Sequence, residues 1–147
     1  SQIDRFLMCI TLGYPDAKSE RALLAGTDRR AAIQALKPVM NPADLVVAQR
    51  AALGVHASDA LLDYLQALIA ATRSGRWFQE GLSPRAGIAV LRAAKARAML
   101  NRRDYVAPDD VQAILPQAIA HRLIPVAGAG RGRVEQVRAM VEAVPLP

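Results

Sequence analysis

Polar capping residues followed by proline mark the predicted helix starts, and they constrain the fold more than any other feature. Ser83-Pro84 precedes the alanine-rich run 88–100, and Asn41-Pro42 repeats the signal. Serine and asparagine accept hydrogen bonds from the free N–H groups at a helix start, and proline suits the first helical position. These signals predict helices over 84–100 and from 42 to about 53.

Apolar residues at the helical period predict further helices. The clearest begins at the Ser58 cap, with Leu61, Leu62, Leu65, Leu68 and Ile69 on one face. Another opens at Pro108-Asp109-Asp110, where two acids complement the helix dipole. The stretch 27–38 gives no clear signal beyond a turn or two of helix. The further helices are predicted at 16–25, 58–73, 108–119 and 134–144. The sequence thus predicts an all-α fold in which four to five of these six helices pack as a bundle.

Residues 6–12 form a short apolar run that ends at Gly13-Tyr14-Pro15. Its length predicts a buried β-strand rather than a helix. No second strand signal follows, and an isolated strand is not stable. The chain also opens without methionine, in what looks like the middle of a structural element. We therefore expect a piece of a longer protein, in which other sequence pairs with this orphan strand.

Composition supports a helical protein without covalent or metal staples. Hydrophobic residues make up 52% but aromatic residues only 4%, and the many alanines favour closely packed helices. The single cysteine, Cys9, excludes an intramolecular disulfide, and we expect it in the core rather than as a nucleophile. His56 and His121 have no cysteine or carboxylate cluster around them, so no metal site is predicted. No membrane span or signal peptide is visible, and we expect a cytoplasmic protein.

Arg85 is the strongest functional lead among the individual residues. It falls in the first turn of helix 84–100, where the helix dipole disfavours a cation by about 0.3–1 kcal/mol. The free N–H groups of a helix start instead favour an anion such as phosphate. Arg5 can be interpreted in two ways. It could form a surface ion pair with Asp4, or it could reach towards a phosphate of a partner. The net charge of +6 suggests an anionic partner, although it could also simply aid solubility.

Helix 84–100 also suggests an alternative function. Because the inner face of this helix is predicted to carry Ile88, Leu91, Ala94 and Ala98, its basic residues are predicted to lie on the outer face. A basic helical module could bind nucleic acid through a patch made of Arg92, Lys95, Arg97, Arg102 and Arg103. There is no recognition-helix pattern and no strip of stacking aromatics to accompany this patch. A protein-interaction bundle is a third possibility.

Several segments, taken in order, resemble MoxR-type AAA+ ATPases. Ser1-Gln2-Ile3-Asp4-Arg5-Phe6 resembles the end of the ATPase core of that family, and Leu12-Gly13-Tyr14-Pro15 resembles the turn after its next strand. Gly81-Leu82-Ser83-Pro84-Arg85-Ala86 resembles the sensor 2 motif. Further similarity lies in the lid helix at 55–64 and in the last lid segments at 103–111 and 121–123. The resemblance covers about residues 1–124.

The resemblance implies a division of the chain and two site residues. Residues 1–14 would end the AAA+ core with the arginine finger, last strand and hinge, 15–126 would form the α-helical lid, and 127–147 a glycine-rich linker and C-terminal helix. Arg5 matches the arginine finger, a catalytic residue that acts in trans on a neighbouring subunit's γ-phosphate. Arg85 matches the sensor 2 arginine, which contacts the nucleotide.

The resemblance also implies cofactors and partners for the intact parent. ATP and Mg²⁺ would be its cofactors, and it would act as a homo-oligomer, usually a hexamer, in chaperone-like remodelling. Proteins with von Willebrand A domains are typical partners of this family, and we do not expect nucleic acid to be one. The phosphate loop, Walker B acids and sensor 1 residue of the family would all precede residue 1. We therefore expect this chain alone neither to hydrolyse ATP nor to bind it tightly.

Overall fold

The protein is described here by a computed structural model that covers residues 2–26, 33–127, 130 and 132–147. All regular elements in this described part are helices, and the predicted all-α fold is confirmed. The α-helices are α1 (Ala17–Leu24), α3 (Pro42–Gly54), α4 (Asp59–Arg73), α5 (Pro84–Leu100), α6 (Pro108–Ile119) and α7 (Arg133–Ala143). Two 3₁₀ helices are η1 (Ile3–Arg5) and η2 (Ala120–Arg122). The helical turn expected within 27–38 and the linker expected at 127–132 fall partly outside the described residues.

The predicted helix caps form as the sequence indicates. Asn41 Oδ1 accepts from Asp44 N at 2.8 Å, Ser58 Oγ from Leu61 N at 3.3 Å, and Ser83 Oγ from Ala86 N at 3.2 Å. At the start of α1, Asp16 Oδ1 accepts from the backbone N–H of Ser19 at 2.7 Å. This hydrogen bond lowers the pKa of the Asp16 carboxyl below its ordinary value near 3.8, because it favours the ionised form.

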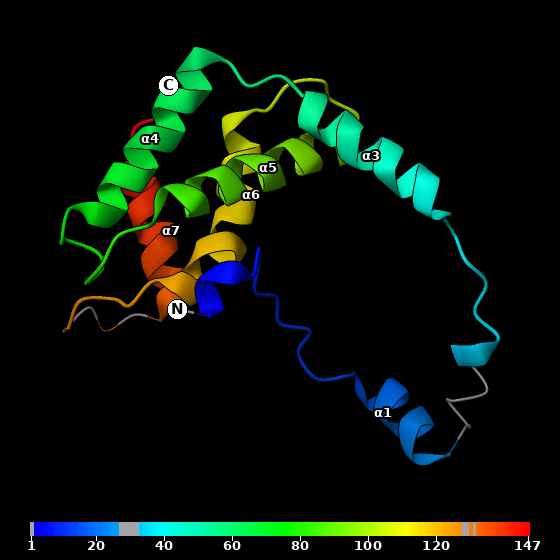
Figure 1. The fold of residues 1–147 in the computed structure, drawn as a ribbon. Coiled ribbons are helices and arrows are strands. Elements are labelled where there is room, and N and C mark those ends of the chain that lie inside the picture. The colour runs from blue at the N-terminus through cyan, green and yellow to red at the C-terminus, as the bar shows by residue number, and fades with distance from the viewer. Residues whose placement is uncertain (1, 27–32, 128–129, 131) are drawn as a thin grey trace.

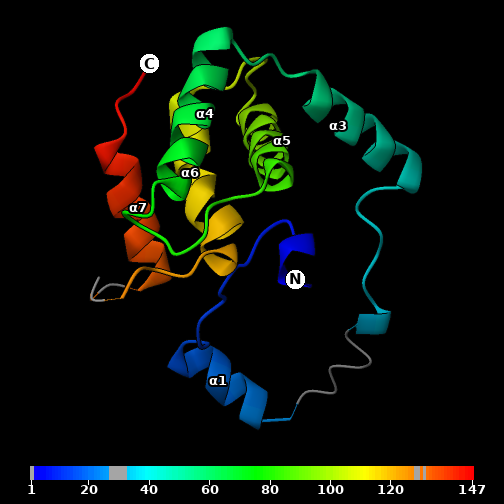
Figure 2. The same cartoon turned by 60° about the vertical axis from the view of Figure 1, so that its left-hand side comes forward.

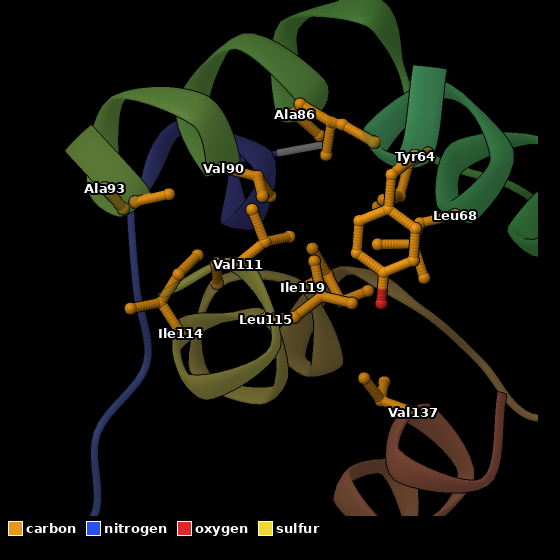
Figure 3. Close-up of a cluster of buried hydrophobic side chains, with 14 of the residues drawn as sticks. Tyr64, Leu68, Ala86, Val90, Ala93, Val111, Ile114, Leu115, Ile119 and Val137 are labelled. Atoms are coloured by element: carbon orange, nitrogen blue, oxygen red, sulfur yellow. The ribbon is translucent and has the colours of Figure 1, made fainter. Parts of the chain in front are cut away.

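Helices α4, α5, α6 and α7 enclose the hydrophobic core (Figure 1). Figure 3 shows side chains from all four helices pointing toward one another, among them Leu68, Val90, Leu115 and Val137. The predicted apolar stripe of α6 is buried, and the helix continues past Pro116 to Ile119 before it tightens into η2. These helices form the scaffold on which the candidate site stands.

Two helix positions predicted to face the core are wrong. Leu62 on α4 is 40% exposed, because it stands about 100° around the helix from the buried Leu61. Ile88 on α5 is 56% exposed, whereas Ala86, Val90, Ala94 and Ala98 turn toward the core. The reason lies in the close approach of α4 and α5. A Cβ added at the buried Gly87 would lie 2.6 Å from Ile69 Cδ1, so the small residues of α5 face α4 and the larger Ile88 is turned outward.

The N-terminal arm lies outside the bundle. Figures 1 and 2 show the chain leaving η1, passing through α1 at a distance from the bundle, and returning through α3 to lie beside α5. Neither α1 nor α3 contains a buried residue. None of the described helices is long and apolar enough to cross a membrane.

The strand predicted at 6–12 does not form in the structure. These residues form no strand ladder, the chain bends at Leu7, and Phe6, Ile10 and Leu12 are exposed. Cys9, which we expected in the core, is also exposed, and its backbone N donates to Gln117 O at 2.9 Å. A strand requires a neighbouring strand to bond its N–H and C=O groups, and the described part of this chain offers none.

Candidate functional site

A cavity of about 470 Å³ brings together the two arginines that the sequence singled out. Arg5 reaches it from η1 and Arg85 from the first turn of α5, although the two are far apart in the sequence. Figure 2 shows η1 next to the N-terminal end of α5. The residues that line the cavity are Asp4, Arg5, Leu7, Arg85, Ile88, Ala89, Arg92 and Arg122.

The cavity carries uncompensated positive charge. Among the described residues, the side chains of Arg5, Arg85 and Arg92 have no ion-pair partner, whereas Arg122 is paired with Asp4. Three guanidinium groups around one small space repel one another, and an anion in that space would relieve the repulsion. Guanidinium groups match the geometry of phosphate oxygens, so phosphate is the ligand that this arrangement fits.

Arg92 was missed as a member of this site. The sequence instead predicts it to belong to a possible nucleic-acid patch on the outer face of α5. It stands seven residues after Arg85, which is about two helical turns, so both side chains lie on one face of the helix. This spacing was the signal in the sequence that could have joined Arg92 to Arg85.

The loop before α5 is fastened to the end of α4, and this attachment positions Arg85. Thr72 Oγ1 accepts from Leu82 N at 3.1 Å and donates to Ile69 O at 2.6 Å. Arg73 donates to Leu82 O from Nε at 3.0 Å and from Nη2 at 2.8 Å. Because Leu82 is buried and Ser83 caps α5, the first turn of α5 has a defined place relative to α4.

Gly81 is required where this loop passes Arg73. A Cβ at position 81 would overlap Arg73 Cγ and lie 2.8 Å from Arg73 Cα, so backbone would have to move. We expect Gly81→Ala to destabilise the bundle by about 1–3 kcal/mol, as overpacking does. Urea unfolding of this chain measures the effect. The matched control is Gly54→Ala, where an added Cβ meets nothing within 4 Å. Equal stabilities of the two variants would contradict this account of the loop.

Three of the five basic residues of the possible nucleic-acid patch make polar contacts within the protein. Arg103 donates to Asp110 from Nη1 and Nη2 at 2.7 and 2.6 Å, and Arg97 Nε lies 3.5 Å from the same carboxylate. The hydrogen bond to Asp110 raises the pKa of the Arg103 guanidinium. Lys95 Nζ donates to Leu53 O at 3.0 Å. The structure therefore gives the nucleic-acid alternative no support beyond net charge.

The described residues hold no group of three or more histidine, cysteine or acidic side chains that could bind a metal ion. His56 bonds through its backbone to Asp104 and Val106, and His121 lies beside the N-terminal arm. The chemistry that this part of the chain can supply is therefore cationic, namely guanidinium groups placed to receive an oxyanion.

Comparison with known proteins identifies the helical bundle. The family profile described as AAA lid domain matches residues 70–143, which include α5, α6 and α7. The chain belongs to the AAA lid domain family. Its region resembling sensor 2 and the last lid segments falls inside this match.

Relatives of the lid point to the MoxR type. The chain is 33% identical over 135 residues to the chaperone MoxR1 of Mycobacterium tuberculosis, a match that covers 84% of this chain and 35% of that protein. It is 37% identical over 124 residues to the uncharacterized protein YeaC of Bacillus subtilis, covering 84% of this chain and 39% of that protein. The MoxR-type resemblance is thus confirmed.

A solved structure shares the fold as well. The crystal structure of a candidate ATPase from Cytophaga hutchinsonii superposes with a TM-score of 0.81 at 28% identity, over 99% of this chain and 48% of that one. The chain therefore spans less than half the length of these three similar proteins.

Proposed function

We propose that this lid works in a MoxR-type AAA+ ATPase that couples ATP hydrolysis to chaperone-like remodelling of other proteins. The observation that carries the proposal is the cavity in which Arg5, Arg85 and Arg92 gather without ion-pair partners among the described residues. The name of the Mycobacterium tuberculosis relative, a chaperone, supports the remodelling part.

Arg5 is the proposed arginine finger. Its exposed position on η1 leaves the guanidinium free to reach a nucleotide held by a neighbouring subunit. Such an arginine stabilises negative charge that develops on the transferred phosphoryl group, and it accounts for about 10³–10⁵ in rate in enzymes that use one. This role requires a homo-oligomer, for which we propose the hexamer that is usual in the family.

Arg85 is the proposed sensor 2 residue. Because Arg85 and Arg5 line one cavity, both can contact phosphate groups of the same nucleotide. We therefore propose that the two act on one nucleotide, so that both act in trans if the finger does. Gly13, with φ of +70°, and the adjoining Tyr14-Pro15 are the proposed hinge between lid and ATPase core.

The chain supplies only part of a nucleotide site. Its guanidinium groups fit the phosphate oxygens of ATP, but the described residues offer no carboxylate cluster for Mg²⁺. ATP bound with Mg²⁺ would supply the phosphoryl group, and we propose that the rest of the parent holds both. Von Willebrand A-domain partners and a cytoplasmic location belong to the same proposal.

The proposal can be tested by comparing this chain with the longer parent. We expect the parent to hydrolyse ATP in the presence of Mg²⁺, and the purified 147-residue chain to show no turnover above background. ATP turnover by the chain alone would contradict the proposal that it supplies only part of the nucleotide site. A DNA probe that shifts with a log–log salt slope of about −5 or steeper would favour the nucleic-acid alternative instead.

A further inference from the structure

Arg122 makes the densest set of side-chain hydrogen bonds between the lid and the N-terminal arm. Its Nη1 donates to Asp4 Oδ1 at 2.6 Å and to Asp4 O at 3.0 Å, and its Nη2 donates to Phe6 O at 2.7 Å. Its Nε donates to Ala118 O at 3.1 Å, one turn back on α6. All three guanidinium nitrogens are therefore used, and the side chain is only 5% exposed.

These bonds enclose Arg5 on both sides. Asp4, within η1, precedes Arg5, and Phe6, at the end of η1, follows it. An oxygen of each accepts a hydrogen bond from Arg122. His121 Nε2 lies 3.2 Å from Phe6 O and can donate a second hydrogen bond there. η1 itself contains no buried residue, and the nearest hydrophobic contact of the arm with the core is the half-buried Met8. Arg122 is thus the principal polar attachment of the segment that carries Arg5.

We infer that Arg122 is a positioning residue that clamps the arginine-finger segment to the end of the lid. The inference rests on the proposed role of Arg5. The clamp leaves the Arg5 side chain unpaired while it restrains the backbone on either side of it. Since η2 follows α6 without a break, the clamp connects the finger segment to the end of the lid directly, in addition to the chain that passes through the proposed hinge at Gly13-Tyr14-Pro15. A change in lid position is therefore transmitted to the neighbour's phosphate through Asp4 and Arg122.

If Arg122 only stabilised the C-terminal end of α6, its hydrogen bonds would differ from those observed. The bond from Arg122 Nε to Ala118 O would suffice to close the end of α6, and Asp4 would then have no part. Asp4 is accordingly the informative position, because it lies on the arm, outside the hydrophobic core of the lid. Asp4→Ala removes the charged acceptor without altering the lid interior, so that failure to fold does not confuse the result.

The clamp can be tested in this chain without any ATPase activity. Cys9 is the only cysteine, but its backbone is bonded to Gln117 of α6, so the nitroxide label goes instead on Gln2→Cys at the N-cap of η1, in a Cys9→Ser background, where it reports the motion of the segment that carries Arg5. We expect the electron paramagnetic resonance spectrum to lose its immobilised component in Asp4→Ala and in Arg122→Gln. The control Arg138→Gln, an exposed position on α7, should leave it unchanged. An immobilised arm in both clamp variants would overturn the inference.

The effect on catalysis is tested in the longer parent. Asp4→Ala should lower kcat about 10²-fold with KM for ATP unchanged, because a misplacement of about 1 Å has that effect. Asp4→Ala combined with Arg5→Ala should be no slower than Arg5→Ala alone, since the clamp acts only through Arg5. Additive losses would overturn the positioning role. If the label is released but Arg5→Ala itself is fully active, the clamp stands and the proposed finger role is wrong.

Discussion

Replacing Arg5 by alanine in the proposed parent ATPase is expected to lower kcat about 10³-fold or more, with little change in KM for ATP. The guanidinium would act on charge that develops in the transition state, so its loss affects the rate rather than ground-state binding. Arg5→Lys should rescue little, because an ammonium group lacks the planar pair of donors. Steady-state turnover, with assembly checked by size-exclusion chromatography, measures the effect.

Two comparisons make this result specific. Arg138→Ala removes an exposed arginine on α7, away from the cavity, and should leave kcat unchanged. Arg85→Ala should have a smaller effect than Arg5→Ala, about 10²-fold, as for the loss of one stabilising donor. Mixing Arg5→Ala subunits with subunits whose phosphate loop is disabled should restore part of the activity if the finger acts in trans. Wild-type rates in an assembled Arg5→Ala variant would refute the site.

Asp110→Ala is expected to have the largest effect on the stability of the lid. The Asp110 side chain is 0% exposed and accepts from Arg103 at two oxygens, and its Oδ2 also accepts from Ala107 N at 3.0 Å. The carboxylate thus closes the start of α6 and joins it to the turn after α5. We expect a loss of about 3 kcal/mol, at the low end for a broken buried ion pair, because Arg103 can still reach solvent.

The neighbouring acid provides a matched control for this prediction. Asp109 also lies in the first turn of α6, but it is exposed, and its side chain has no hydrogen bond or ion pair among the described residues. Asp109→Ala should change stability by no more than about 0.5 kcal/mol. Thermal unfolding of this chain, followed by circular dichroism, should show a Tm lowered by roughly 10 °C only for Asp110→Ala. Similar Tm values for the two variants would show that burial of Asp110 does not matter.

The helices were predictable because their signals are local. A cap such as Ser58 and an apolar stripe such as Val111 to Ile119 act within a few residues of one another, so the sequence pattern carries them. The absence of a strand at 6–12 was not predictable in this way, because strand formation depends on a partner strand that the described residues do not contain. Ile88 was misplaced because the rotation of α5 depends on its contact with Ile69 of α4.

The candidate site divides in the same way. Sequence alone pointed to Arg85, from the conflict between a cation and the start of a helix, and to Arg5, through the resemblance of its segment. Only the tertiary structure put these two arginines on one cavity with Arg92 and attached Asp4 to Arg122 across most of the chain. The physical reason is that helix starts and caps are decided by nearest neighbours along the chain. The meeting of distant charges depends on how the helices pack, which no short stretch of sequence specifies.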